Sequence, residues 1–98
     1  MQAFIVDRVS SAEATLEITN RLGLHLRAAS TLMQALKPFT SSVTLWWGSR
    51  QANARSVTSL IMLGAGIGTR LKVKVEGPDA DAALATIKTL FEHRFGED

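Results

Sequence analysis

The chain has 98 residues, the length of one small domain, so a deep cleft for a large cofactor is not expected. Hydrophobic residues make up 46% of it, and the formal net charge of +2 is too small to indicate binding to nucleic acid or to an anionic membrane. The lack of cysteine excludes disulfides and thiolate nucleophiles, and with only two histidines we expect no metal site and no cofactor.

The first residues carry no recognisable targeting signal. A short apolar patch at residues 3–6 is followed by charge, without the basic flank or the long apolar stretch of a secretion signal. No apolar run approaches the ~20 residues that cross a bilayer. We therefore expect a cytoplasmic protein, with residues 1–11 as an extension of unknown role and residues 12–98 as a single domain.

The first half of the chain predicts a strand, a helix and two more strands. Residues 14–19 alternate apolar and polar, as in a strand with one buried face. Residues 26–37 predict a helix that ends near Pro38, because apolar residues recur along one face. Residues 42–47 and 50–53 predict strands joined by a turn at residues 48–49, and alternation should place one of Trp46 and Trp47 in the core.

The second half predicts a short helix, a strand and a longer helix. Residues 56–63 have Ser56 in the position of an N-cap and Gly64 just behind the helix end. Residues 70–76 alternate apolar with charged side chains, as in a strand. The sequence at 77–79 then opens a last helix with an apolar stripe formed by Ala80, Ala83, Leu84, Ile87, Leu90 and Phe91.

This order of elements predicts the fold class. Strand, helix, strand, strand, helix, strand, helix, with each helix apolar on one side, is typical of a two-layer α+β domain. The outer positions of the expected sheet, such as Thr15, Lys72 and Lys74, are polar. We therefore expect an open-faced sandwich, with four strands covered on one face by three helices.

His25 is the main candidate for chemistry, because it lies where a turn leads into the first expected helix. Backbone N–H groups of a first helical turn have no intrahelical partner, and the helix dipole favours negative charge there. The amides of Leu26 and Arg27 could hold a phosphoryl group on His25, and the Arg27 guanidinium could add a charge-assisted contact. Neutral imidazole is nucleophilic near pH 7, so His25 is a suitable carrier.

Two segments resemble known motifs. Residues 23–29, Gly-Leu-His-Leu-Arg-Ala-Ala, are similar to the active-site motif G-(L/I/M)-H-x-R-P-A of the HPr family, the histidine-containing phosphocarriers of the bacterial phosphotransferase system. Residues 55–64 resemble the regulatory-serine segment of the same family, K-S-(I/L)-x-x-(L/V)-(L/M)-x-L-G. The two motifs have the family's usual separation, and the resemblance extends from about residue 14 to residue 91.

The resemblance implies a fold, a function and site residues. The fold would be the βαββαβα sandwich with an antiparallel sheet. His25 would accept a phosphoryl group on Nδ1 from enzyme I, steadied by Arg27, and pass it to a IIA domain or protein of a permease or a regulatory branch. Ser56 would be a regulatory site for an HPr kinase/phosphorylase. The chain would act as a monomeric intermediate of phosphoryl transfer rather than as a stand-alone turnover enzyme.

The chain departs from the family pattern around the histidine. Ala28 replaces the usual proline, which restores one backbone N–H and leaves the first turn of the helix less constrained. The resemblance implies a docking surface for partner proteins at Leu26, Val57, Thr58 and Ile61, and Thr58 makes this surface more polar than in the sugar-transport members.

Two alternative functions stay open at this point. The chain could be a regulatory interaction module, of a nitrogen-type or carbon-control branch, read through the phosphorylation state of Ser56 or His25 with little flux to transport. It could also bind RNA through an exposed tryptophan with Lys72 and Lys74, although no RNP-like aromatic motif supports that function.

Overall fold

A computed structural model describes residues 10–97 of the chain. Four strands, three α-helices and a short 3-10 helix, η1, follow one another in the order β1 (Ser11–Glu17), α1 (Leu26–Ala35), β2 (Ser42–Trp47), β3 (Arg50–Asn53), α2 (Val57–Met62), β4 (Arg70–Glu76), α3 (Ala80–Glu92) and η1 (Arg94–Gly96). The expected order of strands and helices is confirmed. Residues 1–9, most of the expected extension, and residue 98 lie outside the described residues.

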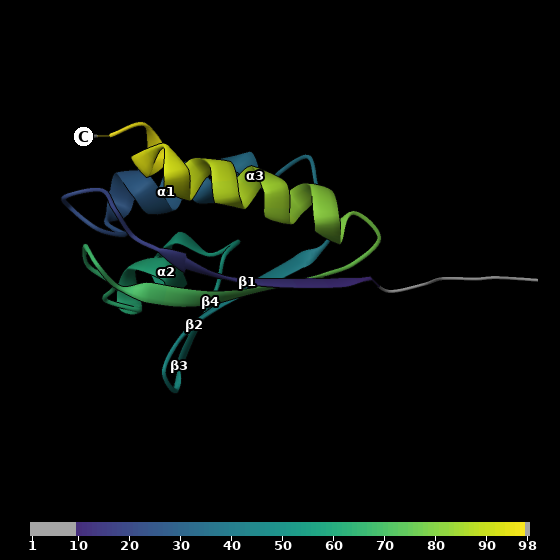
Figure 1. Cartoon of the computed structure of the whole chain (residues 1–98), viewed down its shortest axis with the longest axis horizontal. Coiled ribbons are helices and arrows are strands. Elements are labelled where there is room, and N and C mark those ends of the chain that lie inside the picture. Colours follow the sequence, from purple (N-terminus) through teal and green to yellow (C-terminus); the bar gives the residue numbers. More distant parts are fainter. Residues whose placement is uncertain (1–9, 98) are drawn as a thin grey trace, which may run out of the picture.

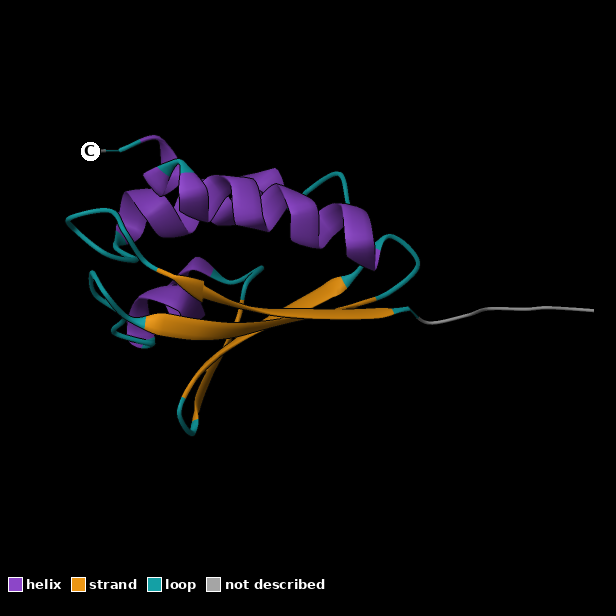
Figure 2. Cartoon of the chain, viewed as in Figure 1, coloured by secondary structure: helices purple, strands orange, loops and turns teal. Residues whose placement is uncertain are grey.

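The strands form one antiparallel sheet in the order β1-β4-β2-β3. β4 is central, pairing Leu71 with Leu16 of β1 and Val73 with Leu45 of β2. α1 and α3 lie in a layer over one face of the sheet, and α2 packs against α1 and β3 (Figures 1 and 2). This is the expected open-faced two-layer α+β sandwich.

The core lies between the sheet and the helices, because both layers are apolar on the side that faces the other. Alternation along β4 buries Leu71, Val73 and Val75, whereas Lys72 and Lys74 point to the uncovered face. The helices contribute one stripe each, which is why their apolar residues recur every three or four positions. Buried side chains from the three helices are Ala28, Ala29, Leu32, Leu60, Ala80, Ala83, Leu84, Ile87 and Phe91.

The prediction that one tryptophan enters the core is wrong. Trp46 is half-buried, on the strand position next to buried Leu45, and Trp47 is 40% exposed. The β2–β3 hairpin extends away from the layer of α1 and α3, so its end has no helix to cover it (Figure 1). Each ring lies near a cation instead: the Arg50 guanidinium is 5.7 Å from the ring of Trp47, and the Lys72 ammonium 5.8 Å from that of Trp46.

Asp79 connects the start of α3 to the segment before β2. Its carboxylate accepts hydrogen bonds from the backbone N–H of Thr40 (2.8 Å), the backbone N–H of Ser41 (3.0 Å) and the Ser41 hydroxyl. These bonds, the one from the Ser41 hydroxyl first, hold the pKa of Asp79 below its usual value of 3.8. The ionised carboxylate is therefore favoured in the folded state.

Asp79→Asn is expected to lower the melting temperature at pH 7, because an amide presents N–H groups to donors that need an acceptor. Since the folded-state pKa is the lower one, the contribution of Asp79 is complete above the unfolded pKa of about 4 and is lost as the pH falls through the folded-state value. The difference in melting temperature between wild type and Asp79→Asn should thus become smaller below pH 4. Asp81→Asn, which removes an exposed carboxylate two residues further on, is the matched control. A difference in melting temperature that stays constant down to pH 3 would contradict this account.

No helix within residues 10–97 has the length and apolar character that a membrane span requires.

Candidate functional site

His25 is the N-cap residue of α1, as the sequence predicted. Its backbone is extended (φ −84°, ψ −175°), and the first hydrogen bond of the helix runs from the N–H of Ala29 to its carbonyl (2.8 Å). The amides of Leu26, Arg27 and Ala28 precede that bond, so none of them has an acceptor in the preceding turn of the helix. An anion on the His25 ring would lie beside the positive end of the α1 dipole.

The turn before His25 is held against the segment that follows α2. Gly23 has φ +71°, and the N–H of Leu24 donates to the carbonyl of Ala65 (3.0 Å). A Cβ on Gly23 would lie 2.8 Å from both the Ala65 carbonyl oxygen and the Gly66 Cα, so only glycine allows the backbones to approach this closely. Leu24 is buried at this junction, which fixes the direction in which the chain enters α1.

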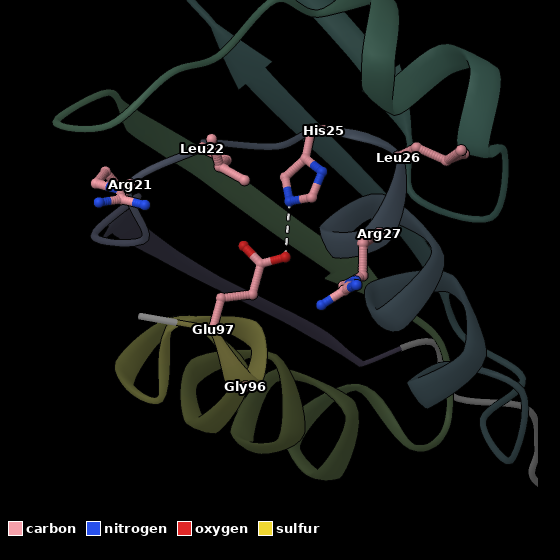
Figure 3. A pocket seen from close by; sticks show the side chains of 7 residues that line it. All are labelled: Arg21, Leu22, His25, Leu26, Arg27, Gly96 and Glu97. Atoms are coloured by element: carbon pink, nitrogen blue, oxygen red, sulfur yellow. Dashed lines mark hydrogen bonds and ion pairs between the residues drawn. The ribbon is translucent and has the colours of Figure 1, made fainter.

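The imidazole of His25 is held by a carboxylate from the other end of the chain. Its Nε2 is 2.7 Å from Oε2 of Glu97, which follows η1 (Figure 3). The second oxygen, Oε1, accepts a hydrogen bond from Nδ2 of Asn20 (2.8 Å), and the same nitrogen donates to the carbonyl of Gly23 (2.7 Å). Because an ionised carboxylate only accepts, Nε2 must carry the proton and Nδ1 of neutral His25 carries the lone pair.

Glu97 is ionised at neutral pH. Burial raises its pKa, but the hydrogen bonds from Asn20 and His25 and the positive charge of Arg27 outweigh burial and hold the pKa below its usual 4.5. The side chain is only 11% exposed, and its carboxylate lies in direct contact with the His25 ring.

An open cavity of about 640 Å³ lies in front of His25. Figure 3 shows the side chains of α1, of the preceding turn and of the C-terminal segment around it. Two arginines and two leucines contribute to its walls, and the lining consists of Arg21, Leu22, His25, Leu26, Arg27, Gly96 and Glu97. The two arginines and the two leucines around His25 suit a small anion delivered by a protein partner.

The predicted docking residues differ in their exposure. Leu26 is 63% exposed beside His25, and Ile61 and Thr58 of α2 are also exposed. Val57 is half-buried and packs against the core, so less of its surface is available to a partner. Three further apolar side chains are exposed in the turn before His25, in α2 and in the loop after it: Leu22, Met62 and Ile67.

Ser56 is the N-cap of α2, as predicted. Its hydroxyl oxygen accepts a hydrogen bond from the N–H of Ser59 (3.1 Å), and the residue is partly exposed. α2 packs against α1, so the structure places Ser56 and His25 at the starts of two neighbouring helices.

Sequence reasoning missed Asn20 and Glu97. Asn20 lies three residues before the active-site motif and outside it, and Glu97 is 72 residues away from His25. Neither lies on the apolar stripe of a helix or in a strand that periodicity identifies. Among residues 10–97 no group of three or more His, Cys, Asp or Glu side chains could hold a metal ion.

A histidine at the start of a helix, beside an open pocket lined by two arginines and with a carboxylate behind the ring, is an arrangement that suits a carrier of a phosphoryl group. Residues 12–93 match the family model described as "PTS HPr component phosphorylation site". The chain therefore belongs to the HPr family, the phosphocarriers of the phosphotransferase system, and the resemblance noted in the sequence is confirmed.

Individual relatives agree with this assignment. The chain is 41% identical over 86 residues to the phosphocarrier protein HPr of Xylella fastidiosa Temecula1, covering 88% of this chain and 97% of that protein. It is 37% identical over 89 residues to the phosphocarrier protein NPr of Escherichia coli K12, covering 90% and 99%. The crystal structure of HPr-C-His from Thermoanaerobacter tengcongensis superposes with a TM-score of 0.84 at 33% identity, covering 89% of this chain and 98% of that one.

Proposed function

We propose that this chain accepts a phosphoryl group on Nδ1 of His25 from phospho-enzyme I and passes it to a IIA domain or protein. The observation that carries the proposal is the position of His25, at the start of α1 with Nε2 occupied by Glu97. Since that contact leaves the lone pair of the neutral ring on Nδ1, only one nitrogen is a nucleophile.

The surroundings of His25 would stabilise the phosphoryl group once it is attached. Arg27 and the first amides of α1 present positive charge and N–H donors to the cavity, and phosphate oxygens are acceptors. The site is open rather than enclosed, which suits a group that two different proteins must reach in turn. Specific docking would come from exposed apolar side chains near His25, of which Leu26 and Ile61 are the predicted ones.

The partner complexes of this proposal are small and transient. The exposed apolar residues are few, and a carrier must leave one partner before it meets the next. A monomer with no resident cofactor suits this function, and the cytoplasm is where we expect enzyme I and phosphoenolpyruvate to meet the chain.

A second candidate is a regulatory module read through Ser56 or His25, and the N-cap geometry of Ser56 favours it. A phosphate on the Ser56 hydroxyl would lie at the amide end of α2, where negative charge is tolerated, so modification by an HPr kinase/phosphorylase would change the charge of the surface beside Val57 and Thr58 more than the fold. Relatives named HPr and relatives named NPr are similarly close to the chain, which leaves the branch it serves to experiment.

The experiment follows phosphoryl transfer in two steps, first to this chain and then to a IIA protein, by intact-protein mass spectrometry. Incubation with enzyme I, Mg²⁺ and phosphoenolpyruvate should add one acid-labile phosphoryl group, and added IIA protein should then remove it and become phosphorylated. Ser56→Ala should behave like wild type in both steps. Uptake without delivery to any IIA protein would favour the regulatory module, and no uptake from an active enzyme I would reject the carrier function.

A further inference from the structure

Asn20 is hydrogen-bonded to Glu97, the residue whose carboxylate contacts the ring of His25. It is 0% exposed, and its Nδ2 spans the gap between the carbonyl of Gly23 (2.7 Å) and Oε1 of Glu97 (2.8 Å). Both neighbours of Nδ2 are acceptors, so the amide cannot turn over without directing its own carbonyl at two oxygens. The orientation of the Asn20 donor is therefore determined by its surroundings.

The buried amide is costly for the fold. Within residues 10–97 its Oδ1 has no hydrogen-bond partner, and a buried polar atom without one destabilises the folded state. An apolar side chain would avoid that cost at this position, but it would supply neither the hydrogen bond to the Gly23 carbonyl nor the one to Glu97.

The segment that brings Glu97 to the site is also strained. Arg94 and Phe95 both have positive φ, 57° and 55°, a region that side chains other than glycine rarely adopt. Phe95 is buried and its ring packs against Phe91, with 4.9 Å between the ring centroids. This anchored left-handed turn redirects the chain at the end of α3, so that the Glu97 carboxylate reaches His25.

We propose that Asn20 and Glu97 position His25 for phosphoryl transfer, Asn20 acting through Glu97, by keeping the proton on Nε2 and the nucleophilic lone pair on Nδ1 throughout the cycle. This inference rests on the proposed function of His25 as the phosphoryl carrier. Two destabilising features of the fold, the buried Asn20 amide with its unpaired oxygen and the strained turn before Glu97, both help to hold this one carboxylate in place.

The covalent steps balance without moving a proton on the ring. The Nδ1 lone pair of neutral His25 forms the N–P bond as the bond from phosphorus to the donor breaks, and the donor leaves with that electron pair. The ring is then a phosphorylated imidazolium, whose Nε2–H faces the negative charge of Glu97. In delivery, the lone pair of a nucleophile on the IIA protein forms the new bond to phosphorus as the N–P bond breaks toward Nδ1, and the ring returns to the neutral form with the proton still on Nε2.

The charges around the site agree with this arrangement. Glu97 offsets the positive charge of the phosphorylated ring, and Arg27 lies where it can offset the charge of the phosphoryl group. Arg21 also lines the cavity. The carboxylate therefore adds no uncompensated negative charge next to the phosphoryl group.

The first test is the tautomer of neutral His25, read from ¹⁵N chemical shifts of the ring in the full chain. Wild type should carry its proton on Nε2. In Glu97→Gln, the only carbonyl oxygen of the new amide should turn toward Asn20, and the NH₂ group would then donate to Nε2 and move the ring proton to Nδ1. Glu92→Gln, an exposed glutamate at the end of α3, is the matched control and should show wild-type shifts.

The second test is the rate of phosphorylation by enzyme I. Glu97→Gln should slow it by about tenfold or more, with an unchanged KM for the carrier, because the lone pair has left Nδ1. Asn20→Ala should have a smaller effect, and the Asn20→Ala/Glu97→Gln double variant should be faster than Glu97→Gln alone. Without the donor of Asn20, the glutamine can turn its carbonyl to Nε2 and restore the productive tautomer.

The possible results distinguish a failure of this positioning role from a failure of the carrier function. Unchanged ¹⁵N shifts in Glu97→Gln, or a double variant with simply additive losses, would overturn it even if wild type is phosphorylated normally. A wild type that enzyme I does not phosphorylate would reject the carrier function, while the tautomer test would still be readable. Asn20→Ser shortens the side chain but keeps a hydroxyl, and if it and Asn20→Ala both fail to fold, Asn20 serves stability and its positioning role is rejected.

Discussion

Phosphorylation by enzyme I and phosphoenolpyruvate should be abolished in His25→Ala and retained in His93→Ala. The alanine removes the only nucleophilic nitrogen of the cavity, and no nearby side chain can replace it: Arg21 and Arg27 are permanently charged, and Glu97 faces the Nε2 side of the ring. His93 is exposed between α3 and the short 3-10 helix η1, so it shares the residue type of His25 without the α-helix start and without a carboxylate hydrogen-bonded to its ring among the described residues.

The measurement is intact mass before and after acid treatment, on variants whose folding has been checked by circular dichroism. Wild type and His93→Ala should gain one phosphoryl group and lose it in acid, because a phosphoramidate is acid-labile whereas a serine phosphate is not. An acid-labile phosphoryl group on His25→Ala would place the carrier nitrogen elsewhere. Equal loss in both histidine variants would show that the substitutions act on the fold rather than on the chemistry.

Gly23→Ala should be the most destabilising single-methyl change near the site, lowering the free energy of unfolding by about 3 kcal/mol. Two effects add at this position. Its φ of +71° disfavours any residue with a Cβ, and that Cβ would lie 2.8 Å from the backbone of Ala65 and Gly66. Relief requires the turn to move away from the loop after α2, and the turn carries His25.

Gly48→Ala is the matched control for this prediction. Gly48 also has positive φ, +62°, but nothing lies within 4 Å of the position of its Cβ. Gly48→Ala should therefore lower the free energy of unfolding only by the cost of placing a Cβ at positive φ, about 1 kcal/mol. Urea denaturation measures both values, and the phosphorylation rate should fall in Gly23→Ala alone. Equal destabilisation of the two variants would show that the approach to Ala65 and Gly66 does not constrain the turn.

Much of the fold could be predicted from the sequence, because its signals are local. The alternation of Leu71, Val73 and Val75 with lysines identifies β4, and the spacing of apolar residues identifies α1 and α3, since each pattern reflects which side of one element is buried. Ser56 as the cap of α2 and His25 as the cap of α1 were predictable for the same reason. The residues around a helix start satisfy their own backbone groups within a few positions of the chain.

Positions at the edge of the layers depended on the tertiary structure. Alternation placed one of Trp46 and Trp47 on the core side of β2, but the hairpin that carries them extends beyond the helices, and neither ring is buried. Asp79 was expected only to open α3, yet its carboxylate binds the backbone of Thr40 and Ser41, 39 and 38 residues earlier. The apolar periodicity of a strand or helix shows which of its sides is buried, but it does not show which other elements lie next to a given side chain.

The candidate site divides in the same way. The sequence by itself identified His25 as the candidate carrier and predicted its helix start, because a motif of seven consecutive residues carries both. Only the tertiary structure decided which nitrogen of His25 is free, because that depends on Asn20 and Glu97, which are 77 residues apart and meet through the left-handed turn at Arg94 and Phe95. A hydrogen bond between distant segments needs the packed layers to bring them together, and no local pattern of apolar residues records it.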